Sequence, residues 1–145
     1  MKGLILDTNI LIQLVRIQNA ADYLSFINPN EANIYLSIVS VAEIKSIALQ
    51  NNWGLQKLAK LDHYLHSFTI IEINNAFINL YTEIDAFSQC KNQRFTTYPH
   101  QSARNMGKND LWIAATASFL GLTLVTTDKD FEHLNGTFLS LLIIN

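Results

Sequence analysis

The sequence is poor in the residues on which disulfide-rich, disordered and membrane-spanning chains depend. Among 145 residues there is one cysteine and there are two prolines, and charged residues make up only 15%. The single Cys90 excludes an internal disulfide framework and a cysteine-based zinc finger. A hydrophobic content of 49% is unlike that of disordered chains. We therefore expect a folded domain that needs neither disulfides nor a structural metal.

Long apolar runs and a large excess of one charge are also missing. No segment reaches the roughly 18 consecutive apolar residues of a membrane span. The first apolar run is interrupted by Asp7, which makes it too short for the apolar region of a signal peptide. The net charge of −2 excludes a generally basic nucleic-acid coat, so affinity for a polyanion needs a local cluster. We expect a soluble, cytoplasmic protein with a single domain over residues 1–145.

Short apolar segments alternate with segments of helical period. The expected strands are residues 4–6, 34–39, 69–73, 122–125 and 138–144. The expected helices are residues 10–17, 40–50, 55–65, 76–87 and 109–120, with a turn or short helix at 128–134. Residues 91–107 have no clean period and contain Pro99, which predicts a long loop. This alternation favours an α/β fold around a mostly parallel central sheet flanked by helices.

Four acidic residues lie where predicted strands end or the next helices begin. Asp7 directly follows the first strand, and Asp128 follows the strand at 122–125. Glu43 and Asp110 fall in the first turns of predicted helices. Because the carboxyl ends of parallel strands share one edge of a sheet, where ligands bind, we expect the four side chains to meet.

A cation would relieve the repulsion that such a meeting creates. Carboxylates a few ångströms apart cannot all stay ionised unless opposite charge is near. All four candidates offer oxygen atoms, which favours Mg²⁺ or Mn²⁺ over zinc. Such an ion activates water and stabilises charge on a phosphoryl oxygen. The pattern therefore predicts metal-dependent hydrolysis of a phosphodiester.

Each acid also has an ordinary structural explanation. The segment from Ser40 to Glu43 fits a capping box, in which the glutamate bonds back to the helix start. Asp110 suits the first turn of any helix because of the helix dipole. Asp128 suits a turn, whereas Asp7 at the end of a buried strand needs a partner or a function. The four together favour the metal site.

At this point the sequence resembles a known family. Four motifs occur in the order and spacing of PIN-domain ribonucleases, and most resemble those of VapC-type toxins from bacterial toxin–antitoxin pairs. They are Leu6-Asp7-Thr8-Asn9, Ser40-Val41-Ala42-Glu43, Asn109-Asp110-Leu111-Trp112-Ile113-Ala114-Ala115 and Leu124-Val125-Thr126-Thr127-Asp128-Lys129-Asp130-Phe131. The resemblance covers nearly the whole chain.

The resemblance implies a single α/β PIN domain that binds Mg²⁺ or Mn²⁺ and cuts RNA as an endoribonuclease. It implies a homodimer silenced by a cognate antitoxin, with tRNA or ribosomal RNA as the target. By the same resemblance the catalytic and metal-binding acids are Asp7, Glu43, Asp110 and Asp128. The positions that support them are Asn9 and Thr126, and Asp130 is a substitute for the fourth acid.

A basic segment adjoins these acids in the sequence. Residues 86–109 contain no acidic residue but hold Lys91, Arg94, Arg104 and Lys108. Such clusters contact phosphates, and the aromatic residues of the same segment are suited to stacking on unpaired bases. Our hypothesis is that this segment guides RNA to the acids. The alternative is a solvated loop whose charges keep it soluble.

Two other functions are compatible with the residues. One is a catalytically silent PIN module that binds RNA. The other is a phosphatase-like enzyme with Asp7 as nucleophile, although that chemistry usually needs a second acid where this chain has Asn9. A seam of Leu58, Leu61 and Leu65 is either plain core or part of a groove for a partner's helix.

Overall fold

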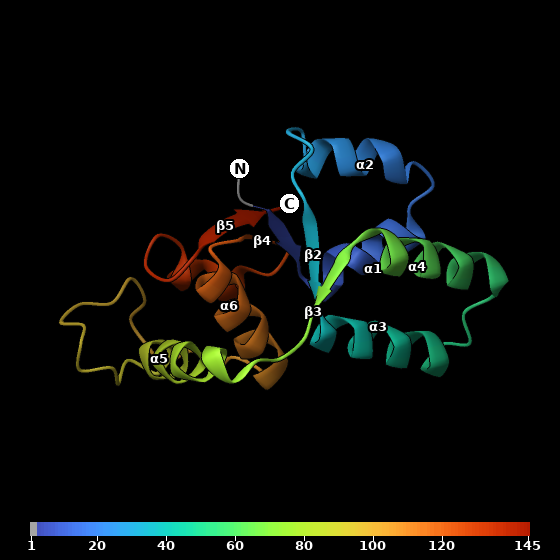
Figure 1. Ribbon diagram of the computed structural model, residues 1–145. Helices are drawn as coiled ribbons and strands as arrows, with labels where there is room; N and C mark the ends of the chain where they lie inside the picture. The colour runs from blue at the N-terminus through green and yellow to red at the C-terminus, as the bar shows by residue number, and fades with distance from the viewer. Residues whose placement is uncertain (1–2) are drawn as a thin grey trace.

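A five-stranded, all-parallel sheet forms the centre of the computed structural model, which describes residues 3–145 (Figure 1). In sheet order the strands are β3 (Thr69–Ile71), β2 (Ile34–Ser37), β1 (Leu4–Leu6), β4 (Thr123–Thr126) and β5 (Ser140–Ile143). The α-helices are α1 (Thr8–Arg16), α2 (Ala20–Ile27), α3 (Ile38–Gln50), α4 (Leu55–Ser67), α5 (Ile78–Ser88) and α6 (Lys108–Leu120). Two 3₁₀ helices are η1 (Asn75–Phe77) and η2 (Lys129–Leu134). The predicted α/β fold is confirmed.

Helices cover both faces of the sheet, with α1, α3 and α4 on one side and α5 and α6 on the other (Figure 1). Neighbouring residues of a strand point to opposite faces, so Ile5 and Leu6 belong to different cores. Both side chains are fully buried. Strand β1 is therefore covered on both faces, as its continuous apolar run predicts.

The start of α3 differs from the prediction. The strand expected over 34–39 ends at Ser37, and α3 begins at Ile38. Ser37 caps the helix, because its Oγ accepts a hydrogen bond from the Val39 backbone N at 3.1 Å. Glu43 is consequently in the second turn of α3, so its assignment to a first turn and the capping box are both wrong.

Helix α2 has no counterpart in the sequence-based expectation. Its Ile27 is its one buried residue, and Phe26 is largely exposed. Ala20, Tyr23 and Leu24 of α2 also pack against the core, but they are only partly buried. The four-residue spacing of Tyr23 and Ile27 is the signal that indicates this helix.

Other boundaries agree more closely. Helix α6 ends at Gly121, whose φ of 66° is left-handed, as expected for a glycine that closes a helix. Strands β3 and β5 are shorter than predicted. The connecting loop, residues 89–107, contains neither helix nor strand, which confirms the loop predicted at 91–107. Within residues 3–145 no helix is long and apolar enough to cross a membrane.

The leucine seam of α4 is core in part and borders an open hollow in part. Leu61 is buried in the core with residues of α1 and α3. Leu58 is partly exposed and borders an open hollow of about 380 Å³ between α3 and α4, together with Leu49 and Trp53.

Candidate functional site

Three of the four predicted acids follow the carboxyl ends of the three middle strands, and the fourth lies at the start of α6. Asp7 directly follows β1, and one residue separates Asp128 from the end of β4. Glu43 lies on the helix that follows β2, and Asp110 is in the first turn of α6. The chain continues from β1 to β2 on one side and returns to β4 on the other, and such a reversal opens a crevice at the carboxyl ends of a doubly wound sheet. We call these four residues the acidic edge.

Asp7 is the buried centre of the acidic edge, with only 4% of its surface exposed. Its Oδ1 accepts a hydrogen bond from the Thr8 backbone N at 2.8 Å, and its Oδ2 accepts one from Thr126 Oγ1 at 2.7 Å. Burial raises the pKa of Asp7, and the charges of Glu43 and Asp128 raise it further, against the lowering effect of the two hydrogen bonds. Thr126 thus supports Asp7 directly.

Asp110 shows that the acids are close enough to act on one another. Its pKa is raised to about 7, first by burial and then by the charges of four neighbouring carboxylates, those of Asp7, Asp128, Glu43 and Asp130. Segments far apart in the sequence therefore bring their negative charges to one place, as the strand-end pattern predicts.

Asp128 has its own local contacts. Its backbone N donates to Thr126 Oγ1 at 2.9 Å, and its Oδ1 accepts from the Asp130 backbone N at 2.8 Å, which caps η2. The charge of Asp128 acts on both Asp7 and Asp110, whereas that of Asp130 acts on Asp110. Asp128 is therefore the more central of the two candidates for the fourth acid.

The acidic edge fits a hard divalent cation by its chemistry, although its side chains are engaged locally. Across residues 3–145, no three His, Cys, Asp or Glu side chains are already placed to hold one ion. Oxygen atoms of Asp7, Glu43 and Asp128 instead accept hydrogen bonds from nearby donors. Mg²⁺ keeps several waters and binds through one or two carboxylates, so it does not need three acids at one point. The pKa values of Asp7 and Asp110 are raised first by burial and then by the neighbouring carboxylates, and a bound cation would offset both costs of keeping these groups ionised.

An open hollow gives access to the acidic edge. Glu43 and Asp110 line it together with Gly107, Lys108 and Asn109, and its volume is about 380 Å³. A second hollow of about 520 Å³ continues from Glu43 and Asn109 along α3 as far as Gln50. The space between α3 and the start of α6 is thus open to a ligand, and its entrance carries one lysine.

The connecting loop is anchored to the body of the protein. The buried ring of Phe87 on α5 packs against Phe95, Tyr98 and His100 of the loop, with ring centroids 4.6 to 5.5 Å apart. The backbone N of Arg104 donates to the carbonyl of Ser88 at 2.8 Å. The loop therefore presents its charged residues from a defined position.

Two buried histidines complete this anchor. His133 of η2 and His100 of the loop lie with ring centroids 4.8 Å apart, and Nε2 of His133 is 2.7 Å from Ser88 Oγ. Their Nδ1 atoms have no hydrogen-bond partner in the part of the chain that the structure describes. Burial lowers the pKa of His133 to about 4, and the charges of His100 and Arg104 lower it as well. His133 is therefore neutral near pH 7.

The predicted basic residues occupy different environments. Lys108 lines the hollow beside Glu43 and Asp110, and Arg104 Nη1 donates to the carbonyl of Lys129 at 3.3 Å, between Asp128 and Asp130 in the chain. Arg94 instead pairs with Glu83 of α5 at 2.9 Å, and Lys91 is exposed on the loop.

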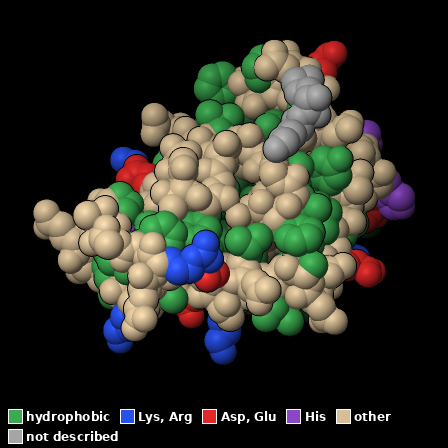
Figure 2. Space-filling view, turned by 60° about the vertical axis from the view of Figure 1, so that its left-hand side comes forward, with side chains coloured by type: hydrophobic (Ala, Val, Ile, Leu, Met, Phe, Trp, Pro, Cys, Tyr) green, Lys and Arg blue, Asp and Glu red, His purple; other side chains and the backbone are tan. Residues whose placement is uncertain are grey.

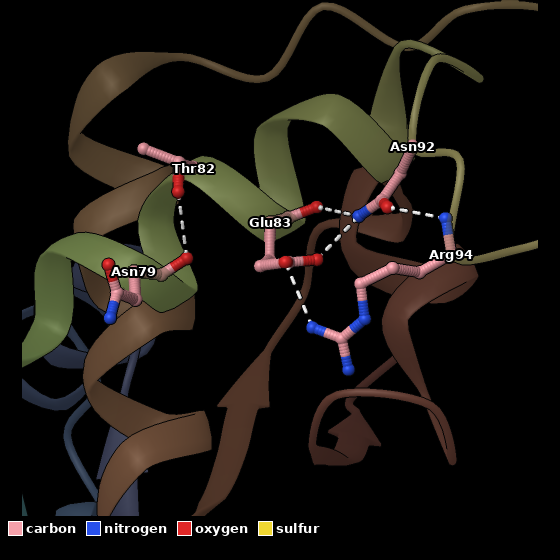
Figure 3. A network of polar contacts seen from close by, with 5 residues as sticks. All are labelled: Asn79, Thr82, Glu83, Asn92 and Arg94. Atoms are coloured by element: carbon pink, nitrogen blue, oxygen red, sulfur yellow. Dashed lines mark hydrogen bonds and ion pairs between the residues drawn. The ribbon is translucent and has the colours of Figure 1, made fainter.

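Figure 3 shows the Arg94 network, in which Asn92 also donates to the carboxylate of Glu83. The hydrogen bonds that Asn92 and Arg94 donate to the Glu83 carboxylate hold its pKa below the usual range, and the bond from Asn92 has the larger effect. On the face shown in Figure 2, Lys and Arg side chains are scattered rather than gathered in one patch. The basic segment of the sequence is thus not a continuous basic surface on that face.

Three further polar residues complete the description of the site. Asn9 is exposed on the first turn of α1, and within residues 3–145 its side chain makes no hydrogen bond to the acids. Sequence reasoning did not single out Thr8, whose Oγ1 lies 2.9 Å from Glu43 Oε1, and it placed Ser40 in a cap. The signal for Thr8 was its position directly after Asp7.

Comparison with known proteins agrees with the fold. Residues 4–136 match the PIN domain family. The chain belongs to the PIN domain family. A relative of this PIN domain is Ribonuclease VapC2 of Haemophilus influenzae, which is 26% identical over 129 residues that cover 88% of this chain and 89% of the relative. Ribonuclease VapC of another strain of that species matches equally well. The family predicted from the four motifs is confirmed.

Solved structures share this fold over nearly the whole chain. The complex VapBC2 of Rickettsia felis, bound to a DNA fragment from its promoter, contains a chain with a TM-score of 0.76 and 24% identity, covering 98% of both chains. FitAcB of Neisseria gonorrhoeae contains one with a TM-score of 0.70 and 21% identity, covering 95% of both chains. At these identities the likeness establishes the PIN fold.

Proposed function

We propose that this PIN domain is an endoribonuclease that depends on Mg²⁺ or Mn²⁺ and hydrolyses RNA phosphodiester bonds at the acidic edge. The observation that carries the proposal is the convergence of carboxylates around Asp110, whose pKa is raised to about 7 first by burial and then by the charges of Asp7, Asp128 and Glu43. Four carboxylates at a ligand-binding edge are costly for a protein unless they serve a cation. The relatives named as ribonucleases support the same activity.

The residues divide the work according to their surroundings. Asp7, Asp110 and Asp128 would hold the ion, and Glu43 would hold a second ion or orient the attacking water. When bound, the cation stabilises charge on the phosphoryl oxygens and acidifies water. The hydrogen bond from Thr126 Oγ1 to Asp7 Oδ2 holds the Asp7 carboxylate in one orientation at the acidic edge.

RNA reaches this edge past the start of α6. Lys108 lines the hollow with Glu43 and Asp110, and Arg104 donates to the backbone between Asp128 and Asp130, so we assign both to the phosphates on either side of the scissile bond. Arg94 and Lys91 have a weaker role at the outer part of the loop, because the charge of Arg94 is already paired. Asn9 supports the site from its exposed position on α1, and Asp130 supports it through its charge on Asp110.

We further propose that the protein is the toxin of a type II toxin–antitoxin module. Its partners would be a cognate antitoxin, a second copy of the chain and an RNA target such as tRNA or ribosomal RNA in the cytoplasm. The support is twofold: the relatives carry the name VapC, and two of the similar chains come from structures named VapBC2 and FitAcB.

The test is cleavage of total cellular RNA by the purified protein with Mn²⁺, followed by mapping of the new 5′ ends. We expect cuts at a defined sequence or structure, and we expect Asp110→Asn to make none. RNA that binds without metal-dependent cleavage would indicate a catalytically silent module instead. A trapped phosphoenzyme on Asp7 would indicate the phosphatase-like alternative.

A further inference from the structure

Thr8 connects two residues of the acidic edge. It is the first residue of α1 and has only 5% of its surface exposed. Its backbone N donates to Asp7 Oδ1 at 2.8 Å, and its Oγ1 lies 2.9 Å from Oε1 of Glu43, which is 35 residues away. One residue thus contacts a carboxylate at the end of β1 and another on α3.

Ser40 sets the direction of these hydrogen bonds. Thr8 Oγ1 also lies 2.9 Å from Ser40 Oγ, but a hydroxyl has a single proton to donate. An ionised Glu43 only accepts, so Thr8 donates to Glu43 and the Ser40 hydroxyl donates to Thr8. Ser40 is fully buried, so water does not compete for its proton. The result is a chain of hydroxyls from Ser40 through Thr8 to Glu43.

Glu43 needs such a donor because two forces move it away from Asp7. Its charge is repelled by the acids whose pKa values it raises, Asp7 and Asp110. The Glu43 side chain is only half-buried, and it lines a hollow that is also lined by Lys108 at the start of α6. A Glu side chain with three free torsions would turn towards that ammonium group if nothing held it.

We infer that Thr8, supported by Ser40, is a positioning residue that holds the Glu43 carboxylate beside Asp7 for the divalent cation. The inference rests on the proposed metal-dependent function and adds a residue to it. Thr8 does not act on RNA itself. It acts through Glu43, and a hydroxyl at this position is the property that matters.

The first experiment measures Mn²⁺ binding to the metal-free full-length protein by calorimetry, without RNA. Loss of one hydrogen bond to a charged group predicts that Thr8→Val, which keeps the shape of the side chain, weakens Mn²⁺ binding by about tenfold. Thr8→Ser keeps the hydroxyl and should bind within about twofold of the wild type. Melting curves of the metal-free variants show that each one is folded, and Thr8→Ala replaces Thr8→Val if that variant does not fold.

The second experiment asks whether Thr8 acts through Glu43. In a Glu43→Ala background, Thr8→Val should change the Mn²⁺ affinity no further, because the residue that Thr8 positions is gone. Equal weakening in both backgrounds, or wild-type affinity in Thr8→Val itself, would overturn the inference. If the wild type bound no Mn²⁺, or if Asp110→Asn still cut RNA, the proposed function would fail instead.

Discussion

Asp110 makes the stability of the metal-free protein depend on pH. Its pKa is about 7 in the folded protein, compared with 3.8 for the ordinary carboxyl. The folded state therefore keeps a proton that the unfolded chain releases. It follows that the free energy of unfolding falls as the pH rises from about 4 to about 7.

We predict that Asp110→Asn stabilises the metal-free protein at pH 7.5. If the whole pKa difference appeared as free energy of unfolding, it would correspond to about 4 kcal/mol. Because the carboxyl group is only partly buried and solvent screens its charge, we expect a gain of about 1–2 kcal/mol. Urea unfolding in EDTA measures the change. Asp62→Asn, at an exposed acid of α4, is the matched control and should have no effect. Equal stability of Asp110→Asn and the wild type would contradict the cost of burial and repulsion that raises the pKa of Asp110.

The convergence of Asp7, Asp110 and Asp128 was predictable because each is tied to a strand end or a helix start that a local pattern indicates. The contacts of Thr8 were not predictable in the same way. Its hydroxyl matters because Ser40 and Glu43 come from another element, and only the packing of α1 against α3 brings them to it.

At the scale of elements, the connecting loop should contribute to RNA binding through its end rather than its middle. Arg104 and Lys108 lie beside the acidic edge, whereas Arg94 is paired with Glu83. We predict that Arg104→Ala and Lys108→Ala each remove one phosphate contact. Each variant should therefore reduce the slope of log affinity against log salt concentration by about one. The measurement is RNA binding to a catalytically inactive variant at several salt concentrations.

Arg94→Ala is the matched control for these two variants, because it also removes one positive charge and Arg94 lies on the same loop as Arg104. Its salt slope should stay closer to that of the wild type. Equal losses in all three variants would mean that the loop contacts RNA along its whole length, as the basic segment of the sequence alone suggested.

The same loop should loosen in acid. The pKa of His133 is about 4, compared with 6.5 in an unfolded chain, so its contribution to stability is present above pH 6.5 and is lost as the pH falls towards 4. Since Asp110 has the opposite effect on global stability, a local probe is required. We predict a lower protection factor for the Arg104 amide, which donates to Ser88, at pH 5 than at pH 7.

Hydrogen exchange followed by NMR measures this change. In His133→Gln, which cannot take up a proton, the protection factor of the Arg104 amide should be the same at both pH values. A wild-type protection factor that does not change with pH would contradict the role of His133 in anchoring the loop.

Elements with a strong local pattern were predicted well, and those shaped by distant contacts were not. The loop was recognised from Pro99 and its lack of period, but its anchoring on Phe87 and His133 depends on rings from other elements. The β-branched Ile38 and Val39 favoured a strand, whereas the cap supplied by Ser37 starts α3 there. Local propensity gave way to capping and packing.

At the scale of the whole molecule, the strand order explains why remote acids meet. Strand β1 lies between β2 and β4, so the carboxylate that follows it is flanked by the residues that follow its two neighbours. The net charge of −2 gives the protein no general attraction for RNA. On the face shown in Figure 2, the Lys and Arg side chains do not form a continuous basic surface. Activity on RNA therefore depends on local features: the acidic edge and the basic residues at its entrance.

The most direct test of this account is the binding of Mn²⁺ to the metal-free protein and to four single variants, measured by calorimetry. We predict that Mn²⁺ binding by the wild type weakens by about tenfold or more in Asp7→Asn, Glu43→Gln, Asp110→Asn and Asp128→Asn, since each removes a charge from the acidic edge. Asp62→Asn should bind like the wild type. Mn²⁺ binding that is equally strong in the wild type and all four variants would contradict the account.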